Sequence, residues 1–110
     1  MDNRKFEIIL HSLIRRSEED SLNWKTTASS STYLLALKGS SISVMYVDGR
    51  IIVDFRNEKG EVVESVMLRS SDELYKNAEE LYVLARRKAL KADETIDRIL
   101  EQLNTGSIAA

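Results

Sequence analysis

Cysteine and proline are both absent from the 110 residues of this chain, and histidine occurs only once. Without cysteine the chain has no disulfide, no thiol nucleophile and no cysteine-based zinc site. A single histidine excludes a histidine metal cluster and any mechanism that needs a pair of imidazoles. The lack of proline is typical of regular elements joined by short turns.

Long apolar runs and a strong excess of one charge are also lacking. No stretch reaches the ~18 apolar residues of a membrane span, and the apolar run that follows Met1–Lys5 is too short for a signal peptide. The net charge of −2 weighs against a dedicated nucleic-acid binder, because such proteins usually carry a basic excess. We therefore expect a cytoplasmic protein with no membrane partner and no cofactor.

No group of residues forms a recognisable catalytic arrangement. His11 is expected at the margin of a helical apolar stripe, where a lone imidazole has no partner for acid–base chemistry. Carboxylates gather at Glu18–Asp20 and at Glu79-Glu80, but neither group has the apolar setting that raises a carboxyl pKa. We expect a non-enzymatic protein without catalytic, cofactor-binding or metal-binding residues.

The clearest signal is a β-rich segment from Thr32 to Leu68. Within it, Asp48-Gly49 favours a two-residue type I′ hairpin, because both central residues of that turn need positive φ. The pairs set by this turn are apolar on both sides: Tyr46 with Ile51, Val44 with Val53, and Ile42 with Phe55. Because side chains alternate between faces, a slip of one residue would scramble this set.

A second turn extends the same face to a third strand. Gly39-Ser40 is compatible with a type II′ turn, which has glycine first, and it predicts that Leu37 pairs with Ile42. The predicted buried face consists of Tyr33, Leu35, Leu37, Ile42, Val44, Tyr46, Ile51, Val53 and Phe55. The strand from Glu61 to Leu68 has apolar residues on both faces, so its register stays open; a bulge is one way to reconcile them.

The opposite face of this sheet is expected to be partly apolar. The same register places Leu34, Met45 and Ile52 in one row, and the basic residues Lys38, Arg50 and Arg56 flank it. A solvated sheet face normally shows polar residues. The row is therefore expected to be covered by a helix of this chain or by another molecule.

Before the meander, residues 2–16 predict an amphipathic helix, because apolar residues recur there at spacings of three and four. In the polar connection that follows, Trp24 is expected to plug one end of the core. Residues 22–24 could form a short extra strand.

After the meander, Ser70 and Glu73 form a predicted capping box. The apolar stripe that follows predicts a long helix ending near Gly106, and residues 107–110 are expected to be a frayed tail. A continuous helix of about 32 residues would be about 48 Å long, which overhangs a compact domain of this size, whose radius of gyration is near ~13 Å.

Two arrangements resolve this overhang. Either the helix breaks near Lys91–Asp93 and its far half folds back, with Asp93 as cap, or it continues and its far half packs on a second copy of the chain. No glycine or proline enforces a break, which favours continuity or a mild kink. A projecting apolar stripe then indicates a homodimer.

Together these patterns predict an α+β fold: an N-terminal helix, an antiparallel β-meander of three or four strands and a long, possibly kinked C-terminal helix, in one domain spanning residues 1–106. We expect a small protein-interaction module, an adaptor or regulatory accessory protein, that acts as a homodimer. The candidate interface residues are Leu34, Met45, Ile52, Lys38, Arg50, Arg56, Ile96, Ile99 and Leu103.

An alternative is a nucleic-acid-binding accessory protein. The order helix, meander, helix resembles the small domains of the signal recognition particle Alu-binding heterodimer. A sheet followed by a long helix is similar to the dimeric single-strand binders of the positive transcriptional coactivator family. This resemblance of element order covers most of the chain, and it implies that Lys38, Arg50 and Arg56 would meet phosphate. The acidic balance and the lack of aromatic residues among these three count against it.

Overall fold

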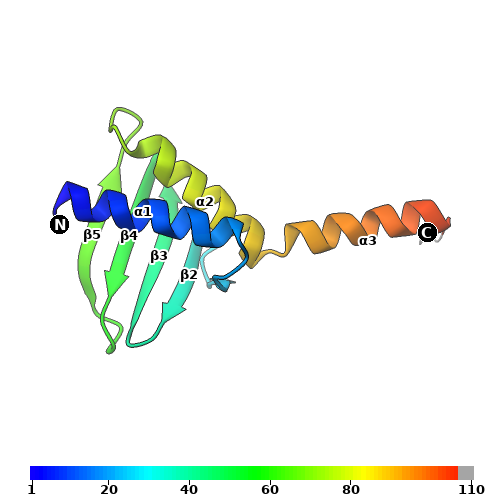
Figure 1. Ribbon diagram of the computed structural model, residues 1–110, viewed down its shortest axis with the longest axis horizontal. Coiled ribbons are helices and arrows are strands. Elements are labelled where there is room, and N and C mark those ends of the chain that lie inside the picture. The colour runs from blue at the N-terminus through cyan, green and yellow to red at the C-terminus, as the bar shows by residue number, and fades with distance from the viewer. Residues whose placement is uncertain (107–110) are drawn as a thin grey trace.

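The computed structural model describes residues 1–106, which form three helices and one five-stranded sheet. The helices are α1 (Asn3–Glu18), α2 (Tyr75–Ala89) and α3 (Ala92–Thr105), and the strands are β1 (Trp24–Thr26), β2 (Thr32–Leu37), β3 (Ser40–Val47), β4 (Arg50–Arg56) and β5 (Val62–Leu68). The strands are antiparallel in the order β1-β2-β3-β4-β5. Figure 1 shows α1 and α2 across one face of the sheet, while α3 extends away from it.

The α+β class is thus confirmed, with two corrections. The sheet has five strands in place of three or four, and two helices follow it in place of one. The tail predicted for residues 107–110 lies outside the described residues. Among residues 1–106, no helix combines the length and the apolarity that crossing a membrane requires.

The predicted hairpin between β3 and β4 is confirmed at every pair. Asp48 and Gly49 both have positive φ, 49° and 77°, as a type I′ turn requires. Val44 pairs with Val53, and both side chains are buried in the core. The register follows from the turn because its two central residues leave only one way to align the flanking strands.

The predicted pairing of β2 with β3 is wrong by two residues. Leu37 pairs with Ser40, so the turn consists of Lys38-Gly39, with Gly39 second at φ 74°. A shift of two keeps every side chain on its predicted face, but it moves β2 along β3. Leu37 and Tyr46 therefore fall near the ends of the strands, where each is 42% exposed, and they do not belong to the buried face.

A bulge settles the register of β5. Phe55 pairs with Glu64 but Arg56 pairs with Val62, which leaves Val63 as the extra residue. An extra residue reverses the alternation of faces on one side of the bulge. This explains why apolar residues occupy both faces in the sequence of this strand.

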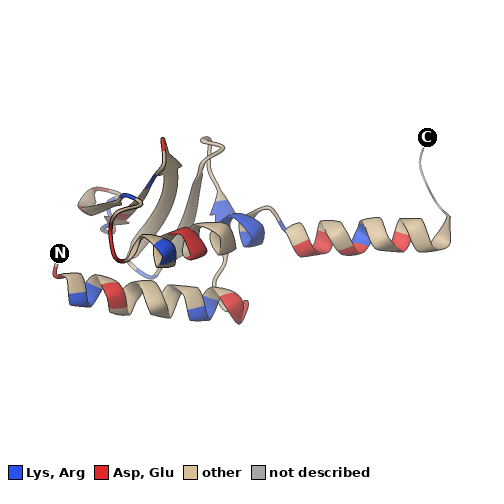
Figure 2. Cartoon of the chain, turned by 90° about the horizontal axis from the view of Figure 1, so that it is seen from above, with Lys and Arg blue, Asp and Glu red and all other residues tan. Residues whose placement is uncertain are grey.

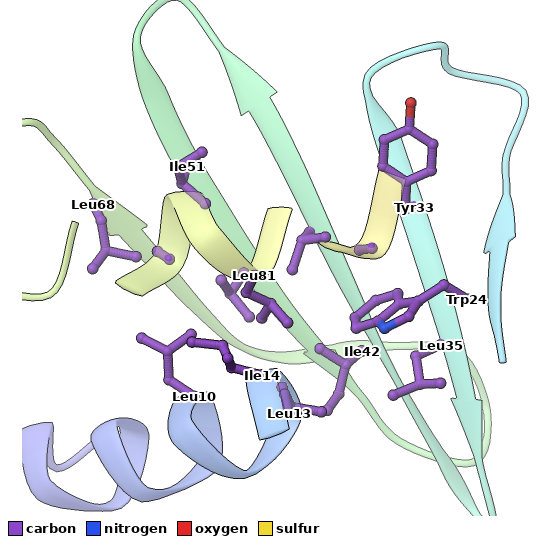
Figure 3. Close-up of a cluster of buried hydrophobic side chains, with 14 of the residues drawn as sticks. Leu10, Leu13, Ile14, Trp24, Tyr33, Leu35, Ile42, Ile51, Leu68 and Leu81 are labelled. Atoms are coloured by element: carbon purple, nitrogen blue, oxygen red, sulfur yellow. The ribbon is translucent and has the colours of Figure 1, made fainter. Parts of the chain in front are cut away.

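The core lies between the sheet and the two helices α1 and α2. Figure 3 shows Leu10, Leu13 and Ile14 of α1 meeting side chains of the sheet and of α2, such as Leu81. Asp2 caps α1, because its carboxylate accepts a hydrogen bond of 2.9 Å from the backbone N–H of Arg4. The stripe predicted for the N-terminal helix is therefore a core-forming face.

Trp24 is buried, as predicted, and its indole is satisfied by hydrogen bonding. Its Nε1–H donates to Oγ of Ser17 over 2.9 Å, and both residues are inaccessible to solvent. Because buried indole N–H groups need an acceptor, this bond fixes the end of α1 against β1.

Helix α2 begins one turn later than the predicted capping box. Leu74 is the N-cap and makes no side-chain hydrogen bond. The carboxylate of Asp72 instead accepts a bond of 2.7 Å from the backbone N–H of Arg69, which closes the turn before the helix. The expected pairing of Ser70 with Glu73 is therefore wrong.

The predicted continuity of the C-terminal helix is also wrong. Lys91 adopts the left-handed conformation, with φ 54° and ψ 47°, between α2 and α3. Helix α3 does not fold back either: it extends away from the sheet (Figure 1), and the molecule measures 54 × 33 × 26 Å. The break needs neither glycine nor proline, because a single left-handed residue interrupts the helical hydrogen bonds.

Candidate interaction surfaces

An exposed apolar stripe lies on α3, which we call the arm (Ala92–Thr105). Four apolar side chains recur along it at spacings of three, one and three residues. They are Ile96, Ile99, Leu100 and Leu103, and each is between 47% and 58% exposed. No residue of the arm is buried. The predicted stripe exists, and within residues 1–106 nothing covers it.

Charge on the arm is asymmetric. Four carboxylates, Asp93, Glu94, Asp97 and Glu101, stand against the single basic residue Arg98, as Figure 2 shows. At 100° per residue, Asp93 and Asp97 border the apolar stripe on the side of Leu100. Arg98 lies on the opposite side. The arm is therefore an amphipathic helix with one acidic flank.

A groove of about 790 Å³ lies between α1 and the end of the sheet that carries the β2–β3 and β4–β5 turns. Its apolar lining includes Ile8, Ile9, Leu22, Leu37, Phe55 and Val63. Ile8 and Val63 are 62% and 60% exposed. Sequence reasoning missed this site, although Ile8, an apolar residue outside the α1 stripe, was a signal for it.

The charged side chains that line the groove are both arginines, Arg16 and Arg56. The guanidinium of Arg56 is engaged elsewhere, because it donates a hydrogen bond of 2.7 Å to Oγ of Ser43. Arg16 makes no ion pair within residues 1–106. The groove is thus apolar with one basic group at its rim.

The outer face of the sheet carries no helix, as Figure 2 shows. Met45 pairs with Ile52, as predicted, and Met67 extends this row across β5. Leu34 does not belong to the row, because the shift of β2 places it opposite Ser43. The predicted three-residue row is therefore wrong for Leu34, and Met67 was missed because the bulge could not be placed.

The basic residues predicted to flank that row do not converge. Lys38 lies in the β2–β3 turn and Arg50 follows the β3–β4 turn, so the eight residues of β3 separate them by about 26 Å. Arg56 lies 3.7 Å from the carboxylate of Asp54. Lys38 and Arg56 therefore lie at one end of the sheet and Arg50 lies at the other.

Three tyrosines cluster where α2 crosses the sheet. The ring of Tyr82 lies 5.6 Å from that of Tyr33 and 5.9 Å from that of Tyr46. Its hydroxyl donates a hydrogen bond of 3.2 Å to the backbone carbonyl of Ser31. Burial, and then the neighbouring Tyr33, raise the pKa of Tyr82 above its ordinary value. The cluster fastens α2 to the β1–β2 loop.

Comparisons with protein-family models, with curated proteins and with solved structures find no match for this chain. The surfaces of the molecule are therefore the basis for inferring its function.

Proposed function

We propose that this protein is a non-enzymatic protein-interaction module, an adaptor or regulatory accessory protein that acts as a homodimer. Its binding element is the arm. The observation that carries the proposal is the exposed apolar stripe of α3, which lies outside the core formed by the rest of the chain.

The spacing of the stripe supports this role. Ile96, Ile99, Leu100 and Leu103 occupy positions i, i+3, i+4 and i+7, which is the pattern by which an amphipathic helix docks into an apolar groove. Isolated helices of this length are marginally stable in water. Burial of the stripe against a partner would therefore stabilise both the helix and the complex.

The remainder of the chain is a suitable scaffold for such an arm. The fifteen buried apolar residues of the core fall between Phe6 and Ala85, and the arm contributes none of them. Removal of the arm therefore leaves the packing of α1, α2 and the sheet intact. A binding element that is separate from the core can be altered without unfolding the protein.

The test is to compare the full chain with a chain truncated after Leu90, and with Ile99→Asp. Sedimentation equilibrium is expected to give a dimer mass for the full chain and a monomer mass for both variants. All three should give the same sheet signal in circular dichroism. Met45→Asp, a matched change on the outer face of the sheet, serves as the control and should leave the dimer intact.

Two results would contradict the proposal. One is a full chain whose mass stays that of a monomer up to high micromolar concentration. The other is a dimer that survives both Ile99→Asp and truncation but is lost in Met45→Asp, because the outer sheet face would then be the interface.

A further inference from the structure

We propose that the arm of one chain occupies the groove beside α1 in a second copy, and that the two copies exchange arms reciprocally. This inference rests on the proposed function and names both the partner and the surface that receives the arm. It is carried by two uncovered apolar surfaces of one chain that match in shape and in charge.

The groove is a place where the fold lacks a helix. Helices α1 and α2 cover the inner face of the sheet, but they leave the end with the β2–β3 and β4–β5 turns open, as Figure 1 shows. Leu37 and Val63 are exposed there although they belong to an apolar lining. A third amphipathic helix, packed beside α1, would complete this layer.

The arm has the chemistry to fill that place. Its stripe is aliphatic, as most of the apolar residues that line the groove are. On its acidic flank Asp97 makes no ion pair within residues 1–106, whereas Asp93 is held by Arg87 over 2.6 Å. Arg16, also without an ion pair there, is the free cation of the groove lining. Opposite charges therefore meet when the arm lies in the groove.

The short connection disfavours insertion of the arm into the groove of its own chain. Only Leu90 and Lys91 separate α2 from α3, so the start of the arm is fixed to the end of α2. Helix α1 lies between α2 and the groove (Figure 1), and a helix is about 10 Å in diameter. A partly exposed ion pair between Asp20 and Lys88, over 2.7 Å, also ties the end of α1 to the end of α2. The groove is therefore more readily filled by another copy.

Reciprocal exchange of the arms gives a closed dimer in which no arm and no groove remains free. A one-way contact would leave a free arm at one end of the pair and a free groove at the other, and further copies would add without limit. An exchange about a two-fold axis covers both arms and both grooves in a dimer. The inference therefore predicts a dimer that does not grow into longer assemblies.

The absence of cysteine makes cross-linking a direct test. Chains carrying Ile8→Cys alone and Ile99→Cys alone are mixed and oxidised, and the mixture is expected to give a disulfide-linked dimer containing one of each. A mixture of Met45→Cys with Ile99→Cys is the control and should remain uncross-linked. A double variant that closes its disulfide within one chain would overturn the exchange.

Substitutions of apolar residues by aspartate distinguish this inference from the proposed function. Ile8→Asp and Ile99→Asp should each raise the Kd of the dimer at least tenfold. An equimolar mixture of the two should recover part of the dimer, since one intact arm then meets one intact groove. If Ile99→Asp abolishes the dimer but Ile8→Asp does not, the arm remains the binding element and the groove is not its site. If neither acts, both proposals fail.

Charge reversal tests whether the acidic flank of the arm lies beside Arg16 of the groove. Arg16→Glu and Asp97→Arg are each expected to weaken the dimer about 2- to 5-fold, as for exposed ion pairs. The double variant should return towards the original Kd. If the losses of dimer affinity in the two single variants simply add in the double variant, the pairing of the acidic flank with Arg16 is contradicted.

Discussion

Helices α1 and α3 both carry an apolar stripe at helical spacing, and the two stripes have opposite surroundings. On α1 the stripe formed by Phe6, Leu10, Leu13 and Ile14 is between 1% and 7% exposed, whereas the four stripe residues of α3 are between 47% and 58% exposed. Both helices have ordinary lengths, 16 and 14 residues. The two stripes therefore differ in what covers them.

This contrast shows that an amphipathic pattern predicts a buried helix face but not the molecule that buries it. A helical apolar stripe indicates that the helix has a partner, because burial of that stripe supplies most of its stability. It does not say whether the partner belongs to the same molecule. For α1 the partner is the sheet together with α2. For α3 no residue is buried within residues 1–106, and the partner we propose is a second copy of the chain.

The largest difference between the two helices is expected in the free energy of unfolding when one leucine of each stripe is replaced by alanine. Leu10→Ala removes a side chain from the core and should lower the free energy of unfolding by about 2–5 kcal/mol. Leu100→Ala, in dilute protein, should change it by less than about 0.5 kcal/mol. Urea denaturation followed by circular dichroism measures both. Similar losses in the two variants would show that the arm packs on its own chain.

A smaller effect is expected at the end of α1, where the helix is anchored to the sheet. Ser17→Ala removes the acceptor of the buried Trp24 indole N–H, and an unsatisfied buried donor costs about 1–3 kcal/mol. Tryptophan fluorescence during urea denaturation reports this loss. Ser21→Ala, which removes an exposed hydrogen bond to Arg16, is the control and should change stability by less than about 0.5 kcal/mol.

The smallest effect is expected at alkaline pH, and it concerns the body of the molecule rather than the arm. Burial raises the pKa of Tyr82 above 10.0, its ordinary value, so the folded state holds this proton more firmly than the unfolded state. The resulting stability is fully present below about pH 10 and is lost as the pH rises through the raised pKa. Tyr82→Phe should lessen this alkaline decline in the denaturation midpoint. A decline of unchanged steepness would mean that other groups cause it.

The sequence predicted the structure correctly where local geometry, such as that of a turn, determines how distant residues pair. Asp48-Gly49 set the register of β3 and β4 because type I′ geometry demands positive φ at two adjacent positions. Trp24 was placed at one end of the core because its burial removes a large apolar area from water, and it is buried there. The β2–β3 register failed because Lys38-Gly39-Ser40 allows glycine to stand first or second in the turn, and only packing against β3 decides between them.

The candidate site was predictable in part for a similar reason. The stripe containing Ile96, Ile99 and Leu103 follows from helical spacing alone. The groove does not, because it depends on where α1 crosses the sheet and on which strand ends it leaves uncovered. The break near Lys91–Asp93 was one of two arrangements left open, and continuity was favoured because no glycine or proline stands there; the structure instead places Lys91, a residue type that seldom adopts positive φ, in the left-handed conformation.

The nearest-neighbour order of the strands has a consequence for folding during synthesis. Each hairpin of the sheet can form as soon as its own two strands exist, since every pairing joins successive strands. Helix α1 is the exception, because its apolar stripe is covered fully only after residues 75–89 of α2 have been added. Until then this stripe stays exposed on the growing chain. This interval is when a chaperone would have most to bind.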